Sequence, residues 1–281
     1  MLEINNLTKN FEKFKLDNIS FKLEPGYIMG FIGPNGAGKS TTIKLIMNLL
    51  KKDEGEIKVF GKDHIQFEKE IKNRIGFVYD ESYFYEDLNI KQMKNIVAPF
   101  YKDWDDELFN NYMIDFDLDY DIKIKKLSKG MKMKFSLALA LCHNADLIIM
   151  DEPTSGLDPV FRREILDILY NVIQDEKKSI FFSTHITTDL EKIADYITFI
   201  NKGKIVFSKS KDEVLETYRI VKCGNDLLDE STKKEFIGFR TTNVGFEGLI
   251  ENPERFKKTF GNEVIIERPT LEDIMFYSVR R

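Results

Sequence analysis

The sequence has few of the residues and segments that mark several classes of protein. It has only two cysteines, Cys142 and Cys223, and its three histidines lack metal-ligand spacing, so we expect a reducing compartment and no structural metal. The formal net charge of −5 and the pI near 5.5 give no general footprint for nucleic-acid binding. No apolar run approaches the ~20 residues that cross a bilayer, and the N-terminus lacks a secretory pattern. If a membrane is involved, we expect another chain to supply the spanning part.

A glycine-rich segment near the N-terminus follows the pattern G-x-x-x-x-G-K-[ST]. It lies between an apolar, strand-like run at 27–32 and a helix-like run at 41–50. Such a loop binds phosphates because its glycines let backbone N–H groups approach, and because the following helix directs its N-terminus at the negative charge. The alternative is an ordinary glycine-rich turn. The predicted phosphate loop and its first helical residue comprise Gly33, Pro34, Asn35, Gly36, Ala37, Gly38, Lys39, Ser40 and Thr41.

An acidic pair, Asp151 and Glu152, follows the apolar run at 147–150. An aspartate at the end of a buried strand can hold Mg²⁺ beside the loop hydroxyl, so Asp151 is a candidate for the metal, most simply through water. Glu152, one residue further, is a candidate base that polarises the attacking water. The alternative is a capping pair at a strand end.

Two single residues lie near the same predicted site. His185 follows the buried strand at 180–183, where it can contact a terminal phosphate, although a lone histidine is also often packed or exposed. Phe11 lies in a loop between the first two predicted strands, where it can stack on adenine or pack locally.

The rest of the pattern divides the chain into two regions. Strand-like segments alternate with helices, and a mostly helical stretch runs from 88 to 134. Beyond about 217 the segments become short and mixed, with a strand at 263–268 and a helix that starts at Thr270. We predict an α/β domain over 1–216, with a helical subdomain at about 82–140, and a small α+β accessory domain over 217–281.

Further segments resemble those of a known family. The run Leu127-Ser128-Lys129-Gly130-Met131 is similar to the signature segment of ATP-binding cassette (ABC) ATPases, the nucleotide-binding subunits of ABC transporters. The segment 155–158, the phosphate loop, the acidic-pair strand and His185 resemble other motifs of this family in the same order. The resemblance covers about residues 1–215. It implies a P-loop NTPase core, with a mixed sheet flanked by helices and an antiparallel β subdomain.

The resemblance also implies a role for each matching residue. Two subunits are expected to face each other head to tail, with each ATP held between the phosphate loop of one and the signature segment of the other. Within one subunit, Lys39 and the loop backbone are expected to bind the phosphates, and Ser40 and Asp151 to bind Mg²⁺. Glu152 is expected to act as the general base, and His185 to sense the γ-phosphate. Phe11 is expected to stack on adenine. Across the dimer the resemblance assigns the γ-phosphate to Ser128 and Gly130, and the contact between the two halves to Asp158.

The sequence departs from the family pattern at two places. Asp80 replaces the usual glutamine after the strand at 75–79; its carboxylate can still reach the water shell of Mg²⁺, but it adds negative charge near the phosphates. In the signature segment, Lys129 replaces a glycine and Met131 replaces a glutamine. Lys129 is expected to bring a positive charge near the nucleotide of the other subunit.

The segments 76–81, 127–132 and 269–274 together resemble those of exporter-type ATPase subunits of Gram-positive bacteria. This implies a transmembrane permease as partner, a homodimer or a heterodimer with a sister ATPase subunit, and a position on the cytoplasmic face of the plasma membrane. The aromatic run Tyr83, Phe84 and Tyr85 is expected to help receive the permease, the alternative being that these side chains are core. Two other functions stay open: a switch ATPase without a membrane partner, and a weakly hydrolysing regulatory subunit of a heterodimer.

Overall fold

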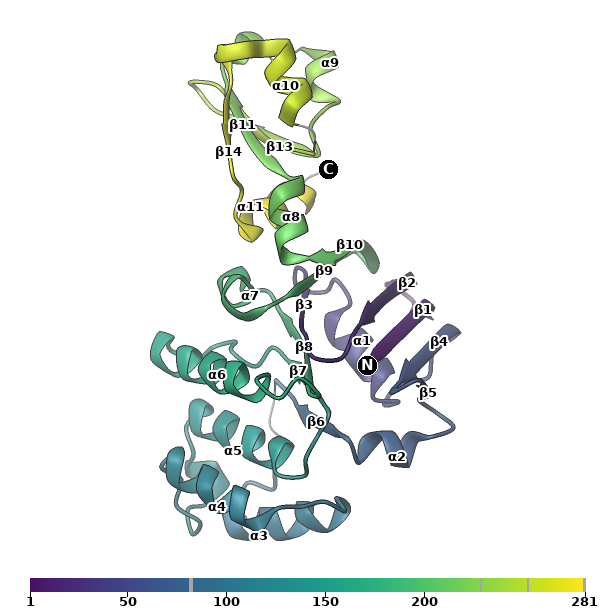
Figure 1. Cartoon of the computed structure of the whole chain (residues 1–281), viewed down its shortest axis with the longest axis vertical. Coiled ribbons are helices and arrows are strands. Elements are labelled where there is room, and N and C mark those ends of the chain that lie inside the picture. Colours follow the sequence, from purple (N-terminus) through teal and green to yellow (C-terminus); the bar gives the residue numbers. More distant parts are fainter. Residues whose placement is uncertain (81–82, 228, 252, 280–281) are drawn as a thin grey trace.

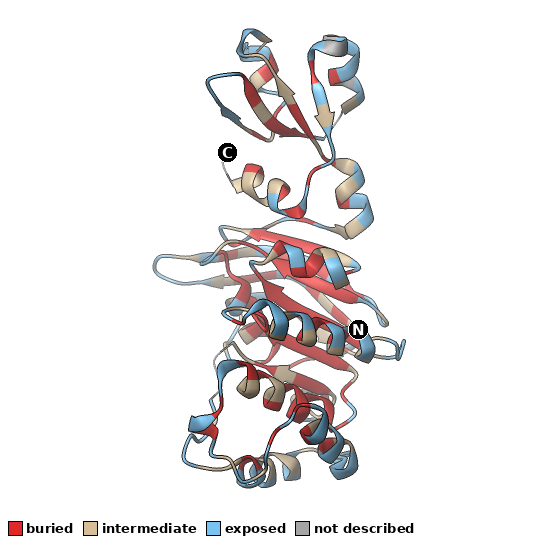
Figure 2. Ribbon diagram, turned by 90° about the vertical axis from the view of Figure 1, so that its left-hand side faces the viewer, coloured by how far each residue is buried: buried red, intermediate tan, exposed pale blue. Residues whose placement is uncertain are grey.

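The structure is a computed structural model that describes residues 1–80, 83–227, 229–251 and 253–279. A six-stranded mixed sheet forms its centre, in the order β10-β9-β3-β8-β7-β6 (Figure 1). Its strands are β3 (Ile28–Ile32), β6 (Ile75–Val78), β7 (Leu147–Asp151), β8 (Ser179–Thr184), β9 (Tyr196–Asn201) and β10 (Lys204–Ser210). Five of these strands run parallel, and only β10 runs antiparallel to its neighbour β9. Every residue of β3, β7 and β8 is buried, as expected for parallel strands that are covered on both faces (Figure 2).

Alternate residues of the central strands face two different layers. Met29, Ile149 and Phe181 belong to a hydrophobic cluster shared with α1 (Lys39–Ile46) and a second sheet. Their chain neighbours, such as Ile148, belong to a cluster shared with α5 (Lys129–Leu141) and α6 (Pro159–Val172). The centre of the molecule is therefore a sheet between two layers, with α1 on one side and α5, α6 and α7 (Thr187–Ile193) on the other (Figure 1).

The second sheet is antiparallel and forms the predicted β subdomain, in the order β2-β1-β4-β5. Its strands are β1 (Leu2–Asn10), β2 (Lys15–Leu23), β4 (Glu54–Val59) and β5 (Lys62–Asp63), followed by the short helix α2 (Glu68–Lys72). The ring of Phe21 stacks on that of Phe181 at 5.7 Å between centroids, which joins this sheet to the central one. A sheet that packs on one face and is wet on the other explains the alternating burial along β2.

The helical subdomain comprises α3 (Ile90–Val97), α4 (Asp106–Asp115) and the first half of α5. It has its own small core, in which Phe109 and Phe135 are fully buried. Cys142 ends α5 in this core, and burial raises the pKa of its thiol to about 12, so it is a packing residue. The start predicted for the subdomain, at 82, lies outside the described residues, and the domain boundaries stay predictions.

The C-terminal region is α+β, as predicted. After α8 (Lys211–Thr217), a third, antiparallel sheet has the order β12-β13-β11-β14. Its elements are β11 (Arg219–Cys223), α9 (Glu230–Lys233), β12 (Gly238–Thr241), β13 (Phe246–Ile250), α10 (Pro253–Phe260), β14 (Ile265–Glu267) and α11 (Leu271–Val279). The strand and helix predicted at 263–268 and from Thr270 correspond to β14 and α11. None of the helices in the described ranges has the length and hydrophobicity that a membrane span requires.

The C-terminal region shares a core with the region 1–216, which the sequence predicts to be the ATPase domain. Helix α11 returns from the third sheet to pack on α7 (Figure 1). Leu271, Ile274 and Tyr277 are buried in the same hydrophobic cluster as Leu190 of α7. The backbone N–H of Leu271 also donates a hydrogen bond to Glu191 Oε1 at 2.9 Å. The two regions are therefore joined by packing as well as by the chain.

Candidate nucleotide-binding site

The predicted site residues meet at one edge of the central sheet because the parallel strands end together. In the register of the sheet, Ile32 pairs with Thr184, and Asp151 pairs with Ser183. The residues that follow these pairs therefore leave the sheet side by side. This brings the phosphate loop, Glu152 and His185 to the carboxyl edge, where ligands of open α/β sheets bind.

The phosphate loop has the backbone that its glycines predict. Gly38 caps α1 with φ of 116°, a conformation that other residues rarely adopt. A Cβ atom on Gly33 would lie 2.3 Å from the carbonyl oxygen of Ile200, so only glycine fits there. The helix then starts at Lys39, with no acidic residue in its first turn to oppose an anion. It ends at Ile46 and not near residue 50 as predicted, because Asn48 turns the chain with φ of 52°.

The three predicted catalytic side chains form a connected group. Lys39 Nζ lies 3.1 Å from Glu152 Oε1, and it also donates a hydrogen bond to the carbonyl oxygen of Gly33 at 2.7 Å. Glu152 Oε2 lies 2.8 Å from Nδ1 of His185 and accepts a second hydrogen bond from its backbone N–H. Lys39 and Glu152 are buried, so their charges compensate each other at the bottom of the site.

The backbone of Glu152 is held in an uncommon conformation. Its φ is 50°, in the left-handed region that a non-glycine residue adopts at a cost of about 1–3 kcal/mol. The N–H of Glu152 donates to the carbonyl oxygen of Ser183 at 3.1 Å and to its hydroxyl at 3.2 Å. These bonds and the contacts with Lys39 and His185 fix the carboxylate at the mouth of the phosphate loop. Strain of this kind is typical of functional sites.

A cavity of about 650 Å³ lies over the phosphate loop. Its walls are formed by loop and helix residues together with Asp80, Glu152, Ser155 and His185. A volume of this order is within the range of small-molecule sites. The cavity is therefore the candidate nucleotide site, and it brings together residues from five separate segments of the chain.

The aromatic wall of this cavity differs from the prediction. The lining residues on that side are Lys13 and Phe14, whereas Phe11, three residues earlier, is 43% exposed with its ring 6.1 Å from that of Phe14. Stacking of adenine on Phe11 stays a prediction. The sequence offered no reason to choose Phe14, because the choice depends on how the loop between β1 and β2 folds over Gly38.

The side chains near the loop fit a hard divalent cation such as Mg²⁺. The hydroxyl of Ser40 and the carboxylate of Asp80 line the cavity, and oxygen ligands of this kind suit Mg²⁺. Asp151 is buried, and its Oδ1 accepts a hydrogen bond from the Ser183 hydroxyl, so it would reach a metal at this place most simply through water. Ser183 was missed in the sequence, although its pairing with Asp151 in adjacent strands explains its position.

The signature residues have clear local roles. Ser128 caps α5 and accepts a hydrogen bond from the N–H of Met131 at 3.2 Å. Asp158 caps α6 in the same way, through the N–H groups of Val160 and Phe161. Gly130 is buried against α6, where a Cβ atom would lie 2.8 Å from the ring of Phe161. Ser128 and Asp158 are exposed, and their action across a dimer stays a prediction.

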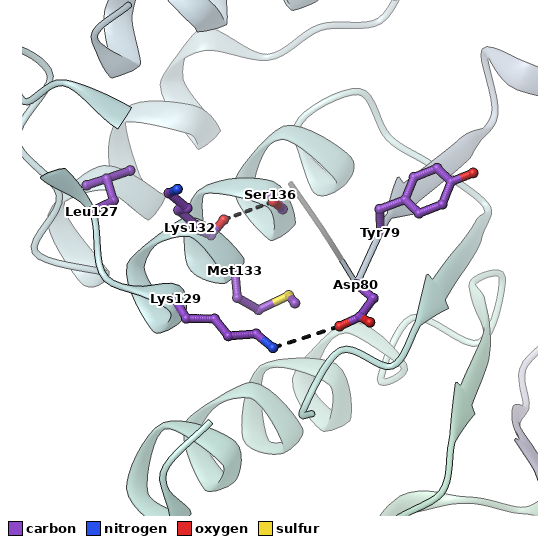
Figure 3. A pocket seen from close by; sticks show the side chains of 7 residues that line it. All are labelled: Tyr79, Asp80, Leu127, Lys129, Lys132, Met133 and Ser136. Atoms are coloured by element: carbon purple, nitrogen blue, oxygen red, sulfur yellow. Dashed lines mark hydrogen bonds and ion pairs between the residues drawn. The ribbon is translucent and has the colours of Figure 1, made fainter. Parts of the chain in front are cut away.

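The side chain of Lys129 lies against Asp80 of the same chain. Its Nζ lies 3.8 Å from Oδ1 of Asp80, at the end of β6, across a pocket between α5 and the sheet (Figure 3). The sequence identified both residues as departures from the family pattern but treated them separately. The structure brings them together.

The predicted docking residues divide into two kinds. Tyr83 and Tyr85 are 73% and 66% exposed, but the ring of Phe84 packs into the helical core, 5.0 Å from that of Phe135. Beside Tyr83 lies an apolar groove of about 230 Å³, lined by Phe77, Met93, Val97, Tyr101 and Leu139 among others. The alternative weighed from the sequence, that these aromatics are core, therefore applies to Phe84 alone.

Comparisons with known proteins point to one family. Residues 16–155 match the sequence model of the family described as ABC transporter. The bacitracin transport ATP-binding protein BcrA of Bacillus licheniformis is 32% identical over 73% of this chain and 68% of its own length. The lantibiotic transport ATP-binding protein SrtF of Streptococcus pyogenes is 32% identical over 75% of this chain and 92% of its own length.

A solved structure agrees with the fold. The ATP-binding cassette MJ0796, described as a dimer in a post-hydrolysis state bound to ADP and phosphate, superposes with a TM-score of 0.66 at 22% identity. The match covers 75% of this chain and 98% of that cassette, so the shared fold includes nearly the whole of MJ0796. The shared fold and the connected catalytic group agree with the sequence comparisons. The sequence relatives show that the chain belongs to the ATP-binding subunits of ABC transporters and is an ATPase.

Proposed function

We propose that this chain powers export through a separate transmembrane permease, at the cytoplasmic face of the plasma membrane. The observation that carries the proposal is the contact of Glu152 with both Lys39 and His185 at the mouth of the phosphate loop. A base held in this way is equipped for turnover, which favours an active subunit over a weakly hydrolysing one. The names of BcrA and SrtF, which refer to bacitracin and lantibiotic transport, support export of a peptide-like or drug-like compound.

In the proposed mechanism, ATP binding rearranges the connected group. Lys39 leaves Glu152 to bind the β- and γ-phosphates, where the N–H groups of the loop and the start of α1 also point. Glu152 is then free to accept a proton from the attacking water. His185 orients the carboxylate through Nδ1 and contacts the γ-phosphate. Ser40, Asp80 and Asp151 would hold Mg²⁺, Asp151 through water, and the ion would supply charge neutralisation at the phosphates.

The proposed working unit is a head-to-tail dimer, either of two copies or of this chain and a sister subunit. Ser128 and Asp158 stand exposed at the N-termini of α5 and α6, and Val160 beside them is 67% exposed. The N–H groups at the start of α5 suit a phosphate. The dimer described for the similar cassette MJ0796, bound to ADP and phosphate, supports this arrangement.

The proposed docking surface for the permease is the apolar groove beside Tyr83, between the sheet and the helical subdomain. Exposed tyrosines at the rim of an apolar groove are typical of protein interfaces. Tyr79 lines this groove, and the next residue, Asp80, lines the nucleotide cavity. The proposed docking surface and the nucleotide site are therefore adjacent along the chain.

Capture of the permease tests this function. The chain, tagged and expressed in Gram-positive cells, is expected to retain a protein with several membrane-spanning helices after solubilisation in detergent. Tyr83→Ala with Tyr85→Ala should lower the yield at least tenfold, because hot-spot aromatics contribute about 2 kcal/mol or more each. Tyr170→Ala, at an exposed tyrosine on α6, is the matched control. Equal yields from the double variant and the wild type would remove the tyrosines from the docking surface.

A further inference from the structure

Asp80 connects two pockets that lie on either side of it. It lines the nucleotide cavity together with Ser40 and Glu152, and it also lines the pocket under α5 that contains Lys129 (Figure 3). Within that second pocket the Lys129 ammonium is 3.8 Å from the Asp80 carboxylate. A residue of the signature segment therefore makes an ion pair with a residue of the chain's own nucleotide site.

Lys129 occupies a position where a cation is unfavourable. It is the first residue of α5, directly after the cap Ser128, and the N-terminus of a helix carries partial positive charge. The carboxylate of Asp80 offsets this repulsion. The ammonium also lies over Gly156 in the segment after β7, where a Cβ atom would be 3.0 Å from Nζ. Lys129 thus contacts, from the signature segment, the two loops that follow β6 and β7.

The ion pair between Lys129 and Asp80 is weak enough for another partner to replace one of its members. Its separation exceeds hydrogen-bond distance, and the two side chains are 49% and 44% exposed. Exposed ion pairs of this kind contribute little, a factor of about two to five in an equilibrium constant. A stronger partner for either group will therefore break it. A Mg²⁺ ion bound with ATP in the cavity that Asp80 lines would be such a partner, because a carboxylate prefers a hard divalent cation and its water shell to a distant ammonium.

We propose that Lys129 and the Mg²⁺ that accompanies ATP compete for Asp80. In the chain without nucleotide, Asp80 holds Lys129. When Mg-ATP is bound, Asp80 turns to the water shell of the metal and Lys129 is released towards the phosphates held by the partner subunit. Occupation of one site thereby frees the cation that completes the opposite site. This inference rests on the proposed function, because Lys129 reaches a phosphate only in the head-to-tail dimer.

A double-mutant cycle on the single chain tests the exchange. Binding of Mg-ATP and of ATP in EDTA is measured by calorimetry in the Glu152→Gln background, at concentrations where light scattering shows a monomer. Asp80→Asn, Lys129→Met and the double variant keep the shapes of the side chains while removing their charges. Lys132→Met is the matched control, because Lys132 lines the same pocket but pairs with Glu86 at 3.1 Å.

The exchange predicts a specific pattern. Lys129→Met should tighten Mg-ATP binding about two- to fivefold, the strength of the lost ion pair, and leave ATP in EDTA unchanged. In the Asp80→Asn background the same substitution should have no effect, and Lys132→Met should have none in either. If Lys129→Met leaves Mg-ATP binding unchanged, or changes it equally with and without Asp80, the two residues do not compete and the inference is overturned.

The dimer gives a second readout that separates this inference from the proposed function. Lys129→Met should raise the Mg-ATP concentration needed for dimerisation about tenfold, because a charge-assisted contact to phosphate is lost. Dimerisation of Lys129→Met at the wild-type concentration would overturn the release of Lys129 towards the partner. Suppose that the monomer shows coupling between Lys129 and Asp80, but Glu152→Gln forms no dimer. This combination would support the exchange and would count against the homodimer.

Discussion

Glu152 is the residue on which the site depends, because its backbone strain and its two partners act together. The left-handed backbone directs the carboxylate at the loop, and Lys39 and His185 hold its two oxygens at 3.1 and 2.8 Å. As the proposed base, Glu152 loses Lys39 when ATP binds, while its backbone and the contact with His185 keep the carboxylate in place, so that little further reorganisation is needed in the reaction. The cost of the strained backbone is offset by these contacts.

Removal of Lys39 should abolish nucleotide binding. In Lys39→Ala the phosphates lose their cation, and the buried carboxylate of Glu152 loses its lysine partner and keeps the contact with His185. We expect the affinity for Mg-ATP to fall at least a hundredfold in a nucleotide titration. Wild-type affinity in this variant would contradict the assignment of the loop. Lys44→Ala, five residues later on α1, is the control for the change of charge.

Glu152→Gln should separate binding from turnover. The amide keeps the shape of the side chain but cannot accept the proton, so phosphate release should fall by about 10²–10⁴-fold, the usual contribution of a general base. Binding of Mg-ATP should persist. Phosphate release at the wild-type rate would exclude Glu152 as the base.

Residues inside continuous sequence patterns were predictable, whereas residues placed by loop packing were not. The phosphate loop and the acidic pair could be read from the sequence because adjacent residues carry each pattern and the parallel strands align their ends. Phe14 and the contact of Lys129 with Asp80 depend on distant segments that meet in space. No local pattern predicts such contacts.

Helices α5 and α6 meet at a contact that leaves no room for a side chain. Gly130 lies against the ring of Phe161, at the place where the two helix N-termini with Ser128 and Asp158 come together. The glycine of the signature segment therefore has a packing reason as well as its predicted role at a phosphate. The signature pattern identified Gly130 as a site residue, but it could not predict the contact of Gly130 with Phe161.

Gly130→Ala should destabilise the chain through this contact. The new Cβ atom would lie 2.8 Å from the Phe161 ring, so one helix must shift, at a cost of about 1–3 kcal/mol of unfolding free energy. Phe161→Leu should partly rescue the alanine variant, because it removes the ring atoms that collide. Urea unfolding of the wild type, the two single variants and the double variant measures this coupling. Additive effects of the two substitutions would show that the contact is not the cause.

The whole molecule is one packed unit in which the C-terminal region is tied to the ATPase region. The cluster that contains Leu190, Leu271 and Tyr277 crosses the predicted boundary at 216–217. Because α7 begins two residues after His185, α11 packs on the helix that follows the predicted γ-phosphate contact. Sequence composition predicted the change of architecture after 217, but not that the last helix returns to the ATPase region.

Leu271→Ala should weaken both regions together. The side chain is 2% exposed, and its truncation should lower the unfolding free energy by about 2–5 kcal/mol. Because the cluster is continuous, we expect a single thermal transition at a lower temperature. Ile265→Ala, at a 61% exposed residue of the third sheet, should change the free energy by less than about 0.5 kcal/mol. Two separate transitions in the wild type would contradict a shared core.

We propose that two copies of this chain hold ATP between them, and the mass of Glu152→Gln in solution tests this dimer most directly. Light scattering without nucleotide should give the mass of one chain, 32.9 kDa. With Mg-ATP the mass should double, because the variant binds ATP without turning it over, and it should return to that of one chain when Lys39→Ala is added. A mass that stays at one chain while ATP is bound would contradict the homodimer.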